Sequence, residues 1–280
     1  RRRRYIFSEA LMEKFFEGEE FTKEELVEGL RTGIHDGTLA PVVCGSAFTG
    51  VGTMQLLYTL VNFAPNPAEV RTEKGTDADG NAVELKYDPN GKPVAFVFKT
   101  VADPFVGKLS YLRVVSGKVT AGEPLTNART GDVEKITKPL TVIGKKQVDS
   151  DGIIAGDIGA VAKLVSAKTG DTLCDAERVV KLPAAAFPLP SLFMAVTVAK
   201  KGDEGKISSA LARLMEEDPT LSYQNNAETH QMVVSGAGDI QIDVLCAKLK
   251  SFIFTASAWI SNSKPLFFIV PTLTKVVEKR

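Results

Sequence analysis

Cysteine and histidine are scarce in this sequence of 280 residues. It has three cysteines, Cys44, Cys174 and Cys246, and two histidines, His35 and His230. The cysteines lie far apart and form no C-x-x-C pair, which excludes a disulfide scaffold and a zinc site. The sequence also starts without a signal peptide. We therefore expect reduced thiols, no metal site and a cytoplasmic protein.

Long apolar runs and an excess of one charge are also missing. Lys and Arg number 34 and Asp and Glu number 34, which excludes a uniformly basic nucleic-acid coat and an acidic solvating tail. The stretch after Lys250 is largely apolar, but residues 261–265 interrupt it after ten residues. A membrane helix needs about 20 apolar residues. We expect a folded protein with no membrane partner.

The neutral total hides regional differences in charge. The net charge is −9 over residues 5–85, +4 over 86–182, −2 over 188–258 and +3 over 259–280. A sequence rich in glycine and aspartate precedes the change of charge near residue 85, and prolines surround the change near residue 185. These shifts predict segments at 1–85, 86–187, 188–258 and a tail at 259–280.

The first segment has an α/β pattern. A helix is predicted over 8–16, and Thr22 with Glu25 has the spacing of a capping box that begins a second helix. Residues 39–44 have the composition of a short buried strand, and a glycine-containing turn then leads into a helix over 53–63.

The middle segment has a different period. Apolar residues over 93–182 recur at every second position, as in Val94, Phe96 and Phe98, and glycines separate these runs at short intervals. This pattern predicts a closed or sandwiched antiparallel β-domain.

The third segment alternates between the two periods. Strands are predicted over 192–198, 220–224 and 231–235, and helices over 203–217 and 240–249. Residues 252–254 are predicted as a last strand. The order β-α-β-β-α-β is the ferredoxin-like, split βαβ arrangement. The fold class is thus a multidomain α+β protein.

Motifs for catalysis are missing from the sequence. No G-x-x-x-x-G-K-[ST] phosphate loop occurs, and Gly236-x-Gly238 lacks the third glycine of a dinucleotide turn because Gln241 stands there. No Ser, His and Asp set and no Cys and His pair has a spacing that indicates covalent catalysis. We expect no catalytic residues. A stand-alone enzyme with an unrecognised site remains the alternative from a different class.

Six short segments, taken in order, carry a resemblance to a known family. They are CGSAF at 44–48, ADPFVGKL at 102–109, AGDI at 155–158, TGDTLC at 169–174, EEDPT at 216–220 and SGAGD at 235–239. Any one of them is weak, but six in order over more than 200 residues are specific. The chain resembles bacterial elongation factor G and its close paralogues among the translational GTPases.

The resemblance implies a role for each part. Residues 1–85 resemble the end of a GTPase domain most of which is lacking, and Ser46, Ala47 and Phe48 resemble its last guanine-contact motif. The β-barrel resembles the second domain, which docks on the ribosome, and 188–258 the third, which relays nucleotide state. The whole protein would use GTP and Mg²⁺ to drive translocation of tRNA and mRNA, as a monomer away from the ribosome.

Departures from the family qualify this assignment. The phosphate loop, both switches and N-K-x-D are absent, so this chain is expected to need no cofactor and to hydrolyse no GTP. After Phe254 the resemblance stops, and 259–280 is expected to be a tail or an altered start of a fourth domain. A ribosomal-protection or release-factor-type GTPase is the alternative within the same class.

The positive charge of the barrel agrees with an RNA partner. Binding to phosphates is independent of sequence and needs exposed lysine and arginine. The candidates are Lys108, Arg113, Lys118, Lys145 and Lys146. A solvated surface of mixed charge is the alternative interpretation of these residues.

Overall fold

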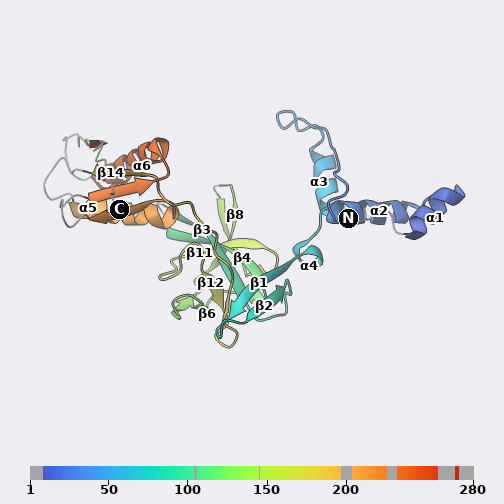
Figure 1. Cartoon of the computed structure of the whole chain (residues 1–280), viewed down its shortest axis with the longest axis horizontal. Helices are drawn as coiled ribbons and strands as arrows, with labels where there is room; N and C mark the ends of the chain where they lie inside the picture. Colours follow the sequence, from blue (N-terminus) through green and yellow to red (C-terminus); the bar gives the residue numbers. More distant parts are fainter. Residues whose placement is uncertain are drawn as a thin grey trace, which may run out of the picture. The chain divides into compact units, whose positions relative to one another are not determined.

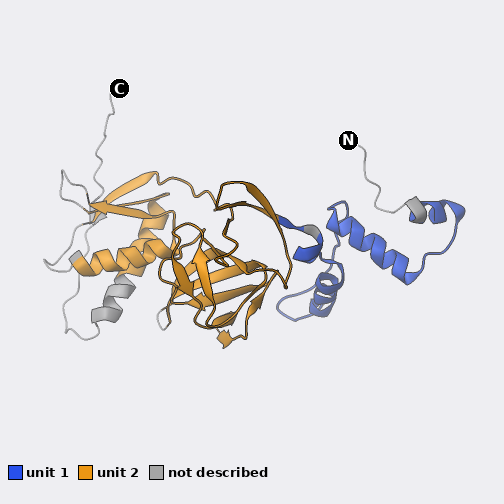
Figure 2. Ribbon diagram, turned by 90° about the horizontal axis from the view of Figure 1, so that it is seen from below, with its two compact units in different colours: residues 1–72 blue, residues 73–280 orange. Residues whose placement is uncertain are grey.

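The structure, a computed structural model, divides into two compact units. They are residues 1–72 and residues 73–280 (Figure 2). The residues that the structure describes are 9–103, 106–144, 146–196, 204–225, 232–257 and 269–270.

Helices form the regular structure of the first unit in its described part. They are α1 (Glu9–Glu17), α2 (Lys23–His35), α3 (Thr53–Phe63) and α4 (Pro67–Val70) (Figure 1). The predicted capping box is confirmed at the start of α2. The Glu25 N–H donates to Thr22 Oγ1 at 3.2 Å, and the Thr22 N–H donates to the Glu25 carboxylate at 2.9 Å. Two backbone donors that a helix start leaves unpaired are thereby satisfied.

Residues 39–44 form no strand, so the prediction of a buried strand there is wrong. Val42 is 88% exposed, and Val43 is also exposed. A strand needs a neighbour with which to exchange backbone hydrogen bonds, and residues 9–71 contain no strand. The apolar composition of this segment therefore does not lead to burial within the unit.

The second unit begins with strands, which are named in chain order. Their bounds are β1 (Thr72–Asp77), β2 (Ala82–Lys86), β3 (Val94–Asp103), β4 (Gly107–Ser116), β5 (Lys118–Val119), β6 (Pro124–Asn127), β7 (Val133–Lys135), β8 (Pro139–Ile143), β9 (Lys146–Asp149), β10 (Ile153–Ile154), β11 (Ile158–Ala162), β12 (Thr172–Cys174) and β13 (Val180–Lys181).

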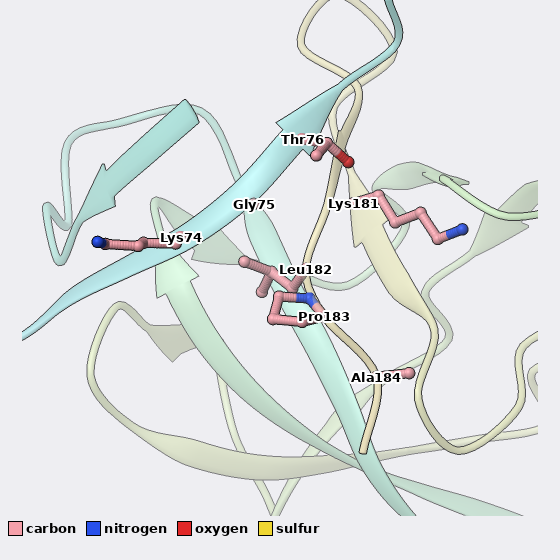
Figure 3. A pocket seen from close by; sticks show the side chains of 7 residues that line it. All are labelled: Lys74, Gly75, Thr76, Lys181, Leu182, Pro183 and Ala184. Atoms are coloured by element: carbon pink, nitrogen blue, oxygen red, sulfur yellow. The ribbon is translucent and has the colours of Figure 1, made fainter. Parts of the chain in front are cut away.

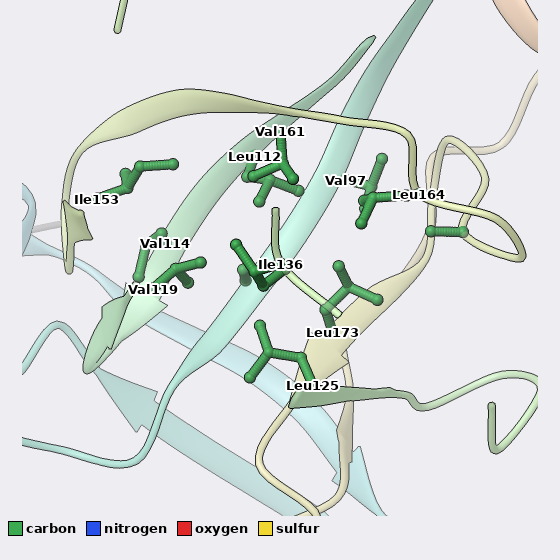
Figure 4. Packing of buried hydrophobic residues seen from close by; sticks show 12 residues of the cluster. Val97, Leu112, Val114, Val119, Leu125, Ile136, Ile153, Val161, Leu164 and Leu173 are labelled. Atoms are coloured by element: carbon green, nitrogen blue, oxygen red, sulfur yellow. The ribbon is translucent and has the colours of Figure 1, made fainter. Parts of the chain in front are cut away.

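An eight-stranded antiparallel sheet forms most of the β-barrel. Its order is β7-β6-β12-β3-β4-β11-β8-β9. Side chains at alternate positions of β4, Leu112 and Val114, are buried with Leu125 of β6 and Leu173 of β12 (Figure 4). Burial alternates as predicted over residues 111–114 of β4, because successive residues of a strand point to opposite faces. In β3, Ala95 and Val97 belong to the same core, while Phe98 is 39% exposed.

The hairpin of β1 and β2 belongs to this second unit. β1 pairs with β13, with Thr76 opposite Lys181 and Asp77 opposite Val180. The turn between β1 and β2 is closed by the Asp77 carboxylate, which accepts from the backbone N–H groups of Asp79 and Asn81. The sequence before residue 85, whose composition indicated a linker, therefore forms a hairpin that pairs with the strand at 180–181.

Residues 192–270 contain a second fold within the same unit. Its elements are β14 (Leu192–Val196), α5 (Glu204–Glu217), β15 (Ser222–Asn225), β16 (Met232–Gly236), α6 (Asp239–Ser257) and β17 (Ile269–Val270). The sheet order is β15-β16-β14-β17, with every pair antiparallel. This order has the first and third strands at the centre, as the ferredoxin-like arrangement requires.

The last strand of this sheet is not where the sequence predicted it. Residues 252–254 continue α6, and Ile269 and Val270 pair with Val196 and Ala195 of β14 instead. No glycine or proline stands between Leu249 and Phe254 to end the helix, so it runs on.

Two buried carboxylates fix the loop between β11 and β12. Glu134 is 4% exposed and accepts from the backbone N–H groups of Val165, Ser166 and Ala167. Asp171, 5% exposed, accepts from the Arg129 guanidinium at 2.6 and 2.8 Å. Asp171 also accepts from the Lys168 backbone N–H and the Asn127 side chain, both at 2.9 Å.

These contacts decide the ionisation of both groups. Burial raises the pKa of Glu134, but the hydrogen bonds from the loop outweigh it and hold the pKa below its ordinary value. Burial also raises the pKa of Asp171, but hydrogen bonds from the Arg129 and Asn127 side chains outweigh burial and hold this pKa below its ordinary value too. Both carboxylates are therefore charged in the folded protein at neutral pH.

Replacing Glu134 by Gln should lower the free energy of unfolding by about 1–3 kcal/mol, because an amide group cannot accept all of these N–H donors. A lowered folded pKa gives stability that is present above the unfolded pKa of about 4.3 and is lost as pH falls through the folded value. Unfolding of Glu134→Gln by urea should accordingly depend less on pH below about 4.3 than that of the wild type. Glu123→Gln, at a half-buried carboxylate that accepts from Thr120, is the matched control and should cost less.

Lys163 has an unusual backbone in the same loop. Its φ is +64°, and it is the one non-glycine residue with positive φ among the described residues. The left-handed region costs an L-residue with a side chain about 1–2 kcal/mol. Its side chain is exposed, so no buried side-chain packing holds this conformation.

Lys163→Gly should raise the free energy of unfolding by up to about 1 kcal/mol, because relief of the strain exceeds the entropy cost of glycine, about 0.5–1 kcal/mol. Lys168→Gly is the matched control in the same loop, where φ is not positive, and it should be destabilising. Thermal unfolding of both variants tests this. A loss of stability in Lys163→Gly as large as that in Lys168→Gly would contradict the assignment of strain to Lys163.

Candidate functional site

The segment before α3 presents Ser46, Ala47 and Phe48 at the surface. The Ser46 N–H donates to the Val51 carbonyl and its own carbonyl accepts from Gly50, both at 2.9 Å. Ser46 Oγ accepts from the Thr49 N–H at 3.3 Å. Phe48 is fully exposed. The three predicted guanine-contact residues thus lie on one turn that its own hydrogen bonds hold.

Two glycines make this turn possible. A Cβ on Gly45 would lie 2.8 Å from the Val51 carbonyl oxygen, and one on Gly52 would lie 2.3 Å from the Cys44 carbonyl oxygen. Gly52 also has φ of +81°, which favours glycine.

The backbone N–H groups of Ala47 and Phe48 have no hydrogen-bond partner in the described part of the chain. Exposed backbone donors beside a serine hydroxyl suit contact with the edge of a base.

The helix that follows has no buried residue. Six large apolar side chains of α3 are between 45% and 81% exposed. They are Met54, Leu56, Leu57, Tyr58, Leu60 and Val61. Exposed apolar side chains in this number are typical of an interface, and the described residues of the first unit do not cover them.

Two of the predicted RNA contacts on the barrel have partners within the chain. Lys108 Nζ lies 3.6 Å from Glu216 Oε2, and its side chain is 17% exposed. Arg113 Nη1 lies 3.0 Å from Glu73 Oε1, with its guanidinium 6.0 Å from the centre of the Phe96 ring. A cation paired with a carboxylate offers less net charge to a phosphate.

Lys118 and Lys146 differ from these two. Both are exposed, on β5 and β9, and neither has an ion-pair partner among the described residues. Lys145 lies outside the described residues. Of the five predicted cations, the structure therefore leaves Lys118 and Lys146 available to a partner and pairs Lys108 and Arg113 internally.

Sequence reasoning did not include Lys163 and Lys168. Both side chains are exposed, and neither has an ion-pair partner in the part of the chain that the structure describes. One signal was present in the sequence, since no acidic residue occurs between Asp157 and Asp171. The conformation that presents these lysines depends on hydrogen bonds to distant strands.

A shallow pocket lies where β1 meets β13. Figure 3 shows its lining, with Lys74 and Lys181 extending away from the centre and Leu182 and Pro183 beside Gly75. The remaining lining residues are Thr76 and Ala184. The lining contains no carboxylate, histidine or cysteine side chain. It therefore offers no general acid and base pair.

The described residues include no group of three or more His, Cys, Asp or Glu side chains placed to hold a metal ion. Among the same residues, no helix has the length and apolar content to cross a membrane.

Two family models match the chain in sequence order. Residues 80–176 match "Elongation factor G domain 2", and residues 187–254 match "Elongation Factor G, domain III". The two matched ranges contain the barrel strands from β2 to β12 and the ferredoxin-like fold up to α6.

Curated relatives and a solved structure agree with these matches. The chain is 39% identical over 245 residues to "Elongation factor G" of Ureaplasma parvum serovar 3 and of Ureaplasma urealyticum serovar 10. The alignments cover 88% of this chain and 36% of each relative. A crystal structure of a protein from Thermus thermophilus superposes with a TM-score of 0.70 and 26% identity, over 94% of this chain and 36% of that one.

The chain thus spans about a third of the length of the curated relatives it matches. Three findings agree on one family: the strand order, the two family matches in sequence order, and the identity over most of the chain. The chain belongs to the elongation factor G family, of which it contains the second and third domains.

Proposed function

We propose that this chain is the ribosome-docking and relay portion of a translational GTPase that drives movement of tRNA and mRNA during protein synthesis. In this proposal residues 1–85 are the end of a GTPase domain plus a linker, whose last part forms the β1–β2 hairpin of the second unit. Residues 86–187 are the docking barrel, and residues 188–258 are the relay domain. The whole protein acts in the cytoplasm as a monomer away from the ribosome. The observation that carries the proposal is the barrel and ferredoxin-like fold matching elongation factor G domains in order.

GTP and Mg²⁺ belong to the whole protein in this proposal. The turn of Ser46, Ala47 and Phe48 fits contact with a guanine edge, since it is exposed and held by its own hydrogen bonds. The 280 residues contain no phosphate loop to hold the triphosphate. The chain's own contribution is thus limited to one side of a nucleotide site.

Docking depends on the exposed cations of the barrel. Lys118 and Lys146 are the predicted contacts that keep their charge free of ion pairs among the described residues. Attraction to phosphates releases counterions, so the affinity falls as salt rises. These two lysines support an RNA surface on the barrel.

The relay is supported by the contact between the barrel and the third domain. Helix α5 packs against β3, and the Lys108 to Glu216 ion pair joins β4 to the end of α5. A rigid helix held on a sheet transmits a displacement of one part to the other. In the proposal, Lys108 connects the barrel to the third domain through its ion pair with Glu216.

Charge reversal tests the docking surface. Lys118→Glu with Lys146→Glu should weaken pelleting of the chain with bacterial 70S ribosomes, because each lysine lost removes a phosphate contact. The slope of log affinity against log KCl should decrease in magnitude by about two, one for each lysine. Binding measured from about 50 to about 200 mM KCl gives this slope.

A matched control changes the charge equally. Lys92→Glu with Lys138→Glu reverses two lysines of the barrel region that pair with Glu177 and Asp149. This double variant should leave the slope near that of the wild type. Equal effects of the two double variants, or no effect of either, would contradict docking through Lys118 and Lys146.

The chain should not hydrolyse GTP on its own, because it lacks the phosphate loop that positions the γ-phosphate. Phosphate release by the purified 280-residue chain, with and without ribosomes, is the measurement. Turnover that depends on this chain would overturn its proposed role as a non-catalytic portion.

A further inference from the structure

The loop between β11 and β12 presents two unpaired cations on a fixed backbone. Lys163 and Lys168 are exposed, and Val165 between them is 87% exposed. The loop itself contains no acidic residue. Its surface is therefore positive, with one exposed apolar side chain between the two lysines.

The backbone of this loop is anchored on both sides. Leu164 is buried in the barrel core close to Val97 (Figure 4). Glu134 accepts from three successive N–H groups of the loop, and Asp171 from a fourth. The Arg129 guanidinium bonds Asp171 and also donates to the Ser166 carbonyl at 3.3 Å. Such anchoring reduces the entropy lost when the loop binds a partner.

The strain at Lys163 is the second, independent observation. A glycine at this position would avoid the left-handed penalty, yet a long cationic side chain is present and is exposed. Residues held in costly backbone conformations concentrate at functional sites. Packing gives no reason for a lysine here, but contact with an external anion does.

The neighbouring cations do not supply the same charge. Lys108, whose carbonyl accepts from the Lys163 N–H, is paired with Glu216, and Arg129 is paired with Asp171. Lys163 and Lys168 are therefore the charges of this loop that no described carboxylate neutralises.

We infer that loop 163–170 is a preorganised docking surface for RNA phosphates, with Lys163 and Lys168 as the contacts. This inference rests on the proposed function, since the RNA would be that of the ribosome, and it adds contacts on a different element from those of Lys118 and Lys146. Two lysines spaced along a rigid loop suit successive backbone phosphates, which carry no sequence information.

Substitution of Lys163 by Gly gives a test in which stability and binding change in opposite directions. Lys163→Gly should raise the Tm and also reduce the magnitude of the salt slope for 70S ribosome binding by about one. Lys163→Gly with Lys168→Ala should reduce it by about two. Lys163→Arg, which keeps the charge and the backbone strain, should leave the slope unchanged. Loss of binding in a stabilised variant cannot arise from unfolding.

Three results would overturn the inference, and they separate it from the proposed function. If Lys163→Gly with Lys168→Ala binds as the wild type does while Lys118→Glu with Lys146→Glu binds weakly, the loop is not a contact and the proposed function stands. If affinity falls with an unchanged salt slope, the loop touches something other than phosphates, such as a ribosomal protein. If the wild-type chain does not pellet with ribosomes at all, the proposed function fails, and this inference fails with it.

Discussion

Burial of two charged carboxylates is the constraint on which the candidate surface of the barrel depends. A charge removed from water is very costly unless hydrogen bonds or an opposite charge replace the water. Glu134 meets this requirement with backbone N–H groups of loop 163–170, and Asp171 meets it with Arg129, Asn127 and the same loop. If the loop moved away, Glu134 would lose its backbone donors, while Asp171 would lose the Lys168 N–H and keep Arg129 and Asn127. Glu134 therefore restrains the backbone of residues 165–167, next to the strained Lys163.

The same need for partners divides the cations of the barrel into two groups. Lys108 and Arg113 have carboxylates within reach, and they join strands or domains of this chain. The second group has no such partner among the described residues and includes the exposed Lys118, Lys146, Lys163 and Lys168. The net charge of +4 over 86–182 indicated a cationic segment, but net charge does not say which cations remain free. Ion pairs formed on folding decide that.

Local signals in the sequence predicted much of the fold, and contacts between distant residues explain the rest. The capping box at Thr22 and the alternation in β4 depend on neighbouring residues, so both were predictable. The strand predicted at 39–44 was wrong because residues 9–71 contain no strand that could pair with it. The strand predicted at 252–254 was wrong because no glycine or proline ends α6 before Phe254. The pairing of Lys108 with Glu216, over 100 residues away, could not be predicted from the neighbouring sequence. The positive φ of Lys163 could not be predicted from it either.

Chemical modification of lysines, with and without ribosomes, tests docking through the barrel most directly. The purified chain is acetylated alone and in complex with 70S ribosomes, and mass spectrometry gives the reactivity of each lysine. Bound ribosomes should protect Lys118, Lys146, Lys163 and Lys168, while the ion-paired Lys92 and Lys138 keep their reactivity. Protection that is absent, or equal for both groups, would contradict docking of the barrel through its unpaired lysines.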